Sequence, residues 1–134
     1  TEVADILRDY RDYTMICAGV FDDMVATLVL ENKEAILERN RQIVEKNLAI
    51  MDAWISKEPK ASWIRPASVS TSFVKLDVDR PIEDFALELL QDYGVLVVPG
   101  NRFDKESHVR IGYCCDKEVL QKGLEKLSQF LNKC

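Results

Sequence analysis

The hydrophobic positions between residues 32 and 55 recur at helical spacing. Most apolar residues lie three, four or seven positions apart and form one stripe, while charged residues occupy the opposite side. This pattern predicts an amphipathic helix from Asn32 to about Ile55. At about 1.5 Å per residue the helix is roughly 36 Å long, which is more than a small domain needs. We therefore interpret residues 32–58 as a long interdomain helix that ends before Pro59.

A shorter apolar patch precedes this helix. Its spacing predicts a short helix that leads into the long one, and Asp22 or Asp23 is a candidate for its N-cap. Residues 11–20 show no clear period, so we expect an irregular segment buried against another surface. We assign residues 1–31 to an N-terminal segment that contains the short helix. The patch consists of Met24, Val25, Leu28 and Val29.

The pattern changes after Pro59. Val74 and Leu76 alternate with polar positions, which predicts a strand with one covered face. Residues 82–93 return to helical spacing and predict an amphipathic helix. Pro81 lies near the start of this helix and Gly94 lies just past its end, which is the usual asymmetry of helix termini.

Two further strands and a last helix follow. Residues 95–98 form a short apolar run, which predicts a buried strand broken by Pro99. Residues 108–113 alternate, with Val109, Ile111 and Tyr113 on one face and His108, Arg110 and Gly112 on the other. Asp116 is the expected cap of a final helix. The apolar stripe of that helix consists of Leu120, Leu124, Leu127 and Leu131.

This order of elements predicts an α+β fold, in which helices cover one side of a small, mainly antiparallel sheet. Residues 59–134 then form a small C-terminal α+β domain. In such a layer Val109 faces the helices and Arg110 points out of the open face, beside Gly112, which leaves room.

Composition excludes several classes of function. The net charge is −5 and the pI is about 4.9, which argues against a nucleic-acid surface. No apolar run approaches the roughly 20 residues needed to span a membrane. The chain has one histidine and four cysteines, two of which are adjacent, so we expect no metal site. We expect reduced thiols, some of them in the core, and a cytoplasmic protein. The cysteines are Cys17, Cys114, Cys115 and Cys134.

Several segments together resemble the C-terminal end of class I/II aminotransferases, which are pyridoxal-phosphate enzymes with the aspartate aminotransferase fold (fold type I). The resemblance covers nearly all of the chain, and its most specific part combines the stretch from Gly94 to Phe103 with the later V-R-I. The segments are, in order, ERNRQIVEKNLAIMDAWI, WIRP, FVKLDV, ALELLQDYGVLVVPGNRF and HVRIGY.

The resemblance implies roles for five residues. The arginine that matches position 110 makes a bidentate salt bridge to the substrate α-carboxylate in that family, and a planar guanidinium suits the two carboxylate oxygens. Gly100 and Phe103 match the loop that borders the site. Ser70 and Thr71 lie where such enzymes place small polar groups near the substrate. A solvated strand arginine and plain strand residues are the alternative interpretations of Arg110 and of this pair.

The resemblance also implies pyridoxal 5′-phosphate as the cofactor of the parent enzyme, amino acids and 2-oxo acids as substrates, and a homodimer. The serine-flanked lysine motif of the family is not present, since Ser56-Lys57 lies at the end of the long helix. We therefore expect a C-terminal fragment that binds no cofactor and has no catalytic residues, and that is inactive alone.

Two alternatives remain open. The same fold supports pyridoxal-phosphate-dependent lyases and cyclases that act on amino acids. A small α+β sheet with an exposed arginine can also serve as a non-catalytic module that binds an anionic ligand or a protein partner.

Overall fold

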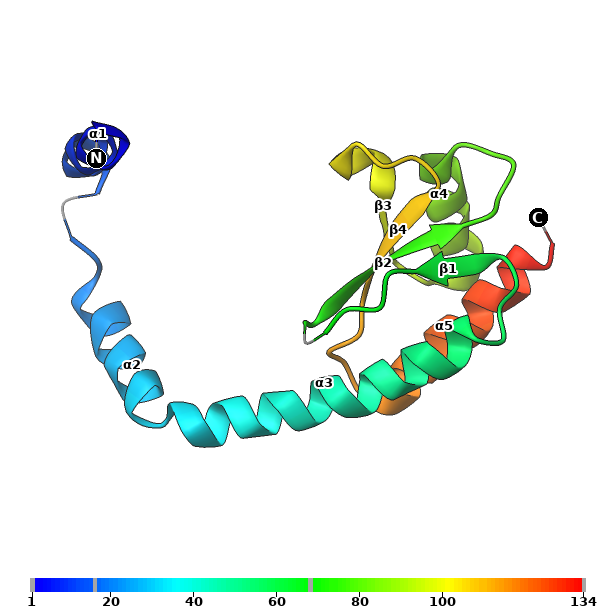
Figure 1. Ribbon diagram of the computed structural model, residues 1–134, viewed down its shortest axis with the longest axis horizontal. Coiled ribbons are helices and arrows are strands. Elements are labelled where there is room, and N and C mark those ends of the chain that lie inside the picture. The colour runs from blue at the N-terminus through cyan, green and yellow to red at the C-terminus, as the bar shows by residue number, and fades with distance from the viewer. Residues whose placement is uncertain (1, 16, 68, 134) are drawn as a thin grey trace. The chain divides into compact units, whose positions relative to one another are not determined.

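The structure is a computed structural model that describes residues 2–15, 17–67 and 69–133. The chain divides into two compact units, residues 1–38 and residues 39–134. The first unit holds two helices and the start of a third, and the second unit holds the sheet with its helices (Figure 1). The elements are α1 (Glu2–Thr14), α2 (Val20–Glu31), α3 (Lys33–Ile55), β1 (Ala61–Trp63), β2 (Thr71–Leu76), α4 (Ile82–Tyr93), β3 (Val98–Pro99), the 3-10 helix η1 (Gly100–Phe103), β4 (His108–Gly112) and α5 (Lys117–Leu131).

The sheet has the strand order β1-β2-β4-β3, and every neighbouring pair is antiparallel. Strand β4 is therefore an inner strand, with β2 on one side and β3 on the other. In the register of these pairs, Arg110 lies opposite Phe73 on β2 and opposite Val98 on β3. The predicted fold class, α+β with a small antiparallel sheet, is confirmed.

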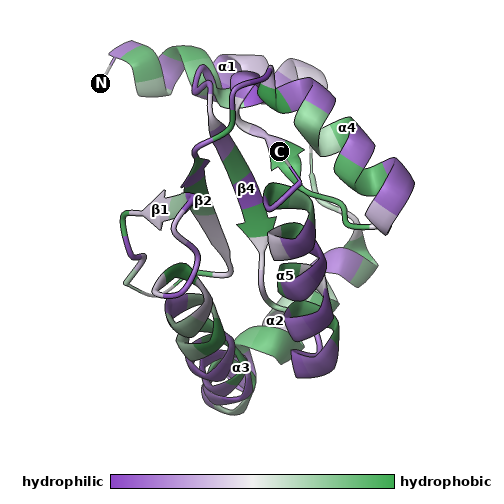
Figure 2. Cartoon of the chain, turned by 90° about the vertical axis from the view of Figure 1, so that its right-hand side faces the viewer, coloured by the Kyte–Doolittle hydropathy of each residue, from purple (hydrophilic) through white to green (hydrophobic). Residues whose placement is uncertain are grey.

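One face of the sheet carries the hydrophobic core. Helix α4 and helix α5 contribute apolar side chains to it, and the C-terminal half of α3 adds Leu48 and Met51. Figure 1 shows α4 behind the sheet and this part of α3 alongside α5. Figure 2 shows the alternation along β4 as successive hydrophobic and hydrophilic bands. The fully buried side chains include Val74, Leu76, Ile82, Phe85, Leu89, Val109, Tyr113, Leu127 and Leu131.

Helix α4 has the predicted termini. Pro81 occupies the N-cap, and Gly94 adopts a left-handed conformation with φ 66° at the C-cap. The Gly94 N–H donates to the Leu90 carbonyl at 3.0 Å. A residue with a Cβ would be strained at this φ, so glycine is the residue that ends the helix without strain.

Helix α1 was not expected, and the predicted irregular segment over residues 11–20 is wrong for residues 11–14 and Val20, which are helical. Met15 and residues 17–19 are irregular, as predicted, but exposed instead of buried. Residues 11–14 end α1, whose apolar positions Val3, Ile6, Leu7 and Tyr10 have helical spacing. Neither α1 nor α2 has a buried residue in this structure. Strong charges between the apolar positions of α1 obscured the period.

The N-cap of α2 also differs from the prediction. Gly19 occupies that position and, having no side chain, makes no capping hydrogen bond. Asp22 and Asp23 lie inside the first turn, where negative charge is favourable because the helix dipole is positive at this end. Asp116 does occupy the N-cap of α5, as predicted, although its side chain makes no capping hydrogen bond.

Two strands differ from the sequence prediction. The expected strand over residues 95–98 is reduced to Val98–Pro99, and the residues before it do not pair with β4. Strand β1 has three residues and was not expected. Both lie at the edges of the sheet, where pairing on one side alone decides their length, and a run this short has no measurable period.

The described cysteines are free and exposed, so the expectation of cysteines in the core is wrong for Cys17, Cys114 and Cys115. Cys134 lies outside the described residues. Over residues 2–15, 17–67 and 69–133, no helix is long and apolar enough to cross a membrane, and no group of three metal-binding side chains comes together. The cytoplasmic location stays a prediction.

The core assignment can be tested on one helix with matched chemistry. Leu89 is fully buried on α4, whereas Leu87 on the same helix is 53% exposed. Leu89→Ala should lower the free energy of unfolding by about 2–5 kcal/mol, because it removes packed atoms and leaves a cavity. Leu87→Ala should change it by less than about 0.5 kcal/mol. Urea unfolding of both variants measures the difference, and equal losses would contradict the assignment.

Candidate functional site

Arg110 lies in the middle of β4. Its sequence neighbours Val109 and Ile111 are buried against the helices, so the alternation of the strand directs Arg110 to the open face. The side chain is exposed there. Its direction is the predicted one, away from the helix-covered side.

Arg110 has no ion pair with any carboxylate of the described residues, whereas other arginines do. Arg65 binds Asp52 at 2.9 Å, and Arg80 binds Glu88 at 2.6 Å. The Cζ atom of Arg110 lies 5.2 Å from the centre of another side chain's ring, that of Phe103. Such a cation–π contact contributes about 0.5–1 kcal/mol at an exposed site, and it leaves the N–H groups of the guanidinium available to a ligand.

Aromatic rings continue from Phe103 across the open face. Phe103 meets Phe73 edge to face, with 5.7 Å between the ring centres. Phe73 in turn stacks on His108 at 5.2 Å. The Nδ1 atom of His108 lies 2.8 Å from the Glu106 carbonyl oxygen. The guanidinium therefore lies at one end of a row of three rings from three different segments.

The tight packing at Gly100 places Phe103 beside Arg110. A Cβ at position 100 would lie 2.2 Å from the Lys105 carbonyl oxygen and 2.5 Å from the His108 carbonyl oxygen. The Lys105 N–H also donates to the Gly100 carbonyl at 3.0 Å. Only glycine allows this approach, so the sequence at this position sets the path of η1.

Helix α4 holds the same loop from its other side. The Glu83 carboxylate accepts a hydrogen bond from Asn101 Nδ2 at 2.7 Å and also pairs with Arg102. The three side chains lie at the start of α4 and in η1. The loop that carries Phe103 is thus tied both to β4 and to α4.

Thr71 begins β2 at the end that pairs with the end of β4, and Ser70 directly precedes it. Thr71 is opposite Gly112 and shares the exposed face with Arg110, two positions along the strand. The Ser70 carbonyl accepts from the Tyr113 N–H at 3.0 Å. A Cβ at Gly112 would meet no atom within 4 Å, so there is open space beside the guanidinium.

Tyr113 anchors this end of the sheet. It is fully buried, and its hydroxyl donates to the Val69 carbonyl. Burial, the largest cause, raises the pKa of the Tyr113 hydroxyl above its ordinary value, so it stays a hydrogen-bond donor. The Tyr113 carbonyl accepts from Asn47 Nδ2 on α3 at 2.6 Å.

Sequence reasoning missed Asn47. The signal was a polar residue inside the apolar stripe of α3, three positions after Val44 and four before Met51. A buried amide must find partners, so such a position indicates a hydrogen bond to a neighbouring segment.

The Ser56–Lys57 pair does not form a cradle for pyridoxal phosphate. Ser56 and Lys57 follow α3, and the Ser56 hydroxyl donates back to the Ala53 carbonyl of the same helix at 2.9 Å. This geometry turns the hydroxyl towards its own helix and offers no phosphate site.

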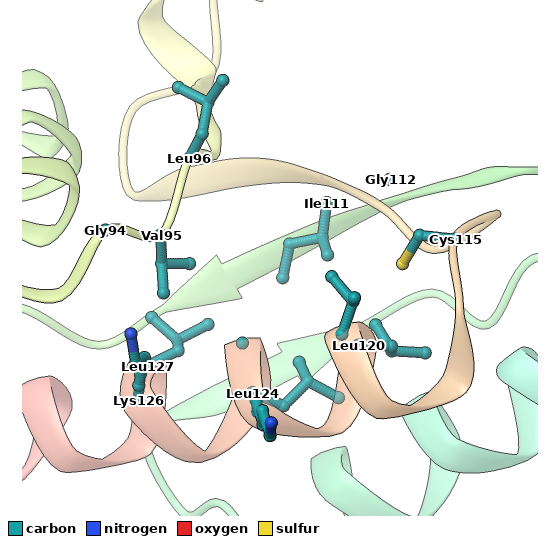
Figure 3. A pocket seen from close by; sticks show the side chains of 13 residues that line it. Gly94, Val95, Leu96, Ile111, Gly112, Cys115, Leu120, Leu124, Lys126 and Leu127 are labelled. Carbon is teal, nitrogen blue, oxygen red and sulfur yellow. The ribbon is translucent and has the colours of Figure 1, made fainter.

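A separate cavity of about 340 Å³ lies between α5 and the segment from Gly94 to Leu96 (Figure 3). Ile111 lines it, so it lies on the helix-covered side of β4, away from Arg110. The Cys115 sulfur points into it, although the residue as a whole is exposed. Burial first, and the neighbouring Asp116 second, raise the pKa of the Cys115 thiol. The cavity is mainly aliphatic and contains no residue of the predicted site.

Comparison with known proteins identifies related sequences. The profile of the family described as "Aminotransferase class I and II" matches residues 2–127. Capreomycidine synthase of Streptomyces vinaceus is 27% identical over 96% of this chain and 33% of its own length. A probable N-acetyl-LL-diaminopimelate aminotransferase of Bacillus subtilis is 26% identical over 98% of this chain and 34% of its own length.

Solved structures of pyridoxal-phosphate-dependent enzymes are also similar to this chain. A PLP-dependent aminotransferase from Streptococcus suis is 67% identical, with a TM-score of 0.90 over 98% of this chain and 35% of that chain. The PLP-dependent cyclase OrfR is 24% identical, with a TM-score of 0.85 over 93% of this chain, and shows the same fold. The chain spans about a third of the length of these relatives.

Alanine substitutions at two glycines test the requirement for glycine at position 100, because they should change the stability of the chain in opposite directions. Gly100→Ala should destabilise the chain by about 1–3 kcal/mol, since its Cβ overlaps two backbone oxygens. Gly123→Ala lies in α5, where a Cβ meets no atom within 4 Å, and should stabilise by about 0.5–1 kcal/mol. Thermal unfolding of the two variants provides the comparison. A stable Gly100→Ala variant would show that the loop does not need glycine.

Proposed function

Because the chain belongs to the class I and II aminotransferase family, we propose that it supplies the part of a pyridoxal-phosphate-dependent enzyme that binds the α-carboxylate of an amino-acid or 2-oxo-acid substrate. Arg110 is the residue that binds it. The observation that supports this role is an exposed guanidinium with no acidic partner among the described residues, held beside an aromatic ring.

The chemistry of the guanidinium suits this task. Its N–H groups form a planar fork, and each of the two carboxylate oxygens can accept one hydrogen bond. Binding in this way fixes the orientation of the substrate's Cα and not only its affinity. Phe103 lies beside the guanidinium, with its ring centre 5.2 Å from Cζ, and limits the directions that the side chain can take.

Other residues border the same space. Gly100 fixes the loop of Phe103, while Ser70 and Thr71 lie near the open space at Gly112. We propose that these groups line the substrate site, with Arg110 as the residue that binds charge. Phe103 and Phe73 then contact the apolar part of the ligand.

The cofactor and the catalytic residues belong to the larger enzyme. When bound, pyridoxal phosphate supplies the electron sink that labilises bonds at the substrate's Cα. The chain spans about a third of its relatives. We propose that it divides into an N-terminal segment 1–31, an interdomain helix 32–58 and a small domain 59–134. The isolated chain is then inactive, and the whole enzyme is a homodimer.

A second candidate reaction keeps the same site. Capreomycidine synthase and the cyclase OrfR are among the similar proteins, which favours a lyase or cyclase acting on amino acids as the runner-up. A bound carboxylate is needed in either reaction, so the proposed role of Arg110 does not identify the reaction type. Incubation of the purified enzyme with amino acids, with and without a 2-oxo acid, distinguishes them, because only transamination requires the acceptor.

The carboxylate role of Arg110 is tested in the active enzyme. Arg110→Lys keeps the charge but loses the fork, and hydrogen bonds to charged groups are worth about 1.5–3 kcal/mol. We therefore expect kcat/KM for the amino acid to fall roughly 10- to 100-fold. Steady-state kinetics measure this change.

Arg102→Lys is the matched control. Arg102 lies in η1, beside Phe103, and pairs with Glu83. A lysine at this position can form the same ion pair. It should leave kcat/KM nearly unchanged. If Arg110→Lys is as active as the unmodified enzyme, Arg110 does not bind the substrate. If the unmodified enzyme processes no amino acid and shows no visible absorbance from bound pyridoxal phosphate, the non-catalytic binding module is the better account.

A further inference from the structure

The side chain of Asn47 connects α3 to the segment that follows β4. It is 3% exposed, and its Nδ2 donates to two carbonyls, at 2.6 Å to Tyr113 and at 2.8 Å to Cys115. Both N–H bonds of the amide are used. These contacts join residues 66 and 68 positions apart in the chain. A buried amide with two such bonds fixes the distance between the helix and this segment.

Tyr113 also binds the segment that leads into the neighbouring strand, β2. Its N–H donates to the Ser70 carbonyl at 3.0 Å, and its hydroxyl donates to the Val69 carbonyl. Tyr113 thus accepts one hydrogen bond from α3 and donates two to the residues directly before β2. The relative position of the two strand ends follows from the position of Tyr113.

The stretch from Arg110 to Gly112 is held by its pairing with β2 and by the burial of Ile111, and side-chain hydrogen bonds to it are few among the described residues. Gly112 has no side chain, and a Cβ there would touch nothing within 4 Å. Among the described residues, the other side-chain bond to this stretch is from Ser72 Oγ to the Ile111 carbonyl, and it is long at 3.4 Å. Because Tyr113 also binds the Ser70 carbonyl directly before β2, we expect a shift of Tyr113 to reach Arg110, three residues earlier, through the backbone of β4 and its pairing with β2.

We propose that Asn47 is a positioning residue for Arg110: by holding Tyr113 and Cys115 it sets the end of β4, and with it the orientation of the guanidinium beside Ser70 and Thr71. This inference rests on the proposed function, since it assumes that Arg110 binds the substrate carboxylate. It assigns to α3 a role in the geometry of the site in addition to its part in the core.

A purely structural role would lower stability without changing substrate binding. The matched control is Trp54→Phe, because Trp54 lies on the same helix and donates from Nε1 to Ser128 Oγ on α5 at 2.8 Å. It removes one bond between α3 and α5, and it does not touch β4. Both variants should lower the midpoint of thermal unfolding, so stability alone does not separate the two roles.

The test is a double-mutant cycle on kcat/KM in the active enzyme, with Asn47→Ala, Arg110→Lys and the combination. Misplacement by about 1 Å can cost about 100-fold in rate, so a partial shift from Asn47→Ala should lower kcat/KM roughly tenfold. Trp54→Phe should leave it within about twofold of the unmodified enzyme. In the double variant, Asn47→Ala should cost little beyond Arg110→Lys, because the group that it positions is already impaired.

Two outcomes overturn the proposal. One is an unchanged kcat/KM in Asn47→Ala, and the other is a double variant whose loss is the product of the two single losses. Both are distinguishable from failure of the proposed function, in which Arg110→Lys alone has no effect. If Asn47→Ala does not fold, Asn47→Ser replaces it in the cycle, since a shorter hydroxyl cannot donate to both carbonyls.

Discussion

The burial of one face of β4 is the constraint on which the site depends. Val109, Ile111 and Tyr113 must face the helices, and the residues between them must then face outwards. A slip of the strand by one residue would exchange the two faces and bury Arg110 among aliphatic side chains. Burial of an unpaired charge costs several kcal/mol, so the core selects the register that exposes the guanidinium.

Contacts at both ends of the open face further restrict the orientation of the Arg110 side chain. On one side Gly100 lets η1 approach the backbone before β4, and Phe103 comes to lie over the guanidinium. On the other side Tyr113 ties the end of β4 to the start of β2, and Asn47 connects both to α3. None of these contacts neutralises the charge of Arg110. The fold therefore orients a cation and leaves its hydrogen-bonding groups open, which is what recognition of a carboxylate requires.

The sequence was informative where a long period was present. The stripes of α3, α4 and α5 and the alternation of β4 gave the fold class and the outward direction of Arg110. It failed where the signal was short or non-local. Strand β1 has too few residues to show a period. A loop was predicted over the last residues of α1, because charged residues between its apolar positions hide the helical spacing. The contact of Phe103 with Arg110 joins residues of different segments, and no local pattern predicts it. Asn47 could have been noticed as a polar interruption of a stripe, but its partners could not.

The central claim is that Arg110 holds the carboxylate of an amino-acid substrate or of its 2-oxo acid. The most direct measurement is a crystal structure of the whole enzyme with a substrate or an unreactive carboxylate analogue bound. We expect the two oxygens of the α-carboxylate to accept hydrogen bonds from the Arg110 guanidinium, at about 2.7–2.9 Å, with Phe103 still beside it. A ligand whose carboxylate binds another residue, with Arg110 exposed to solvent, would contradict the account.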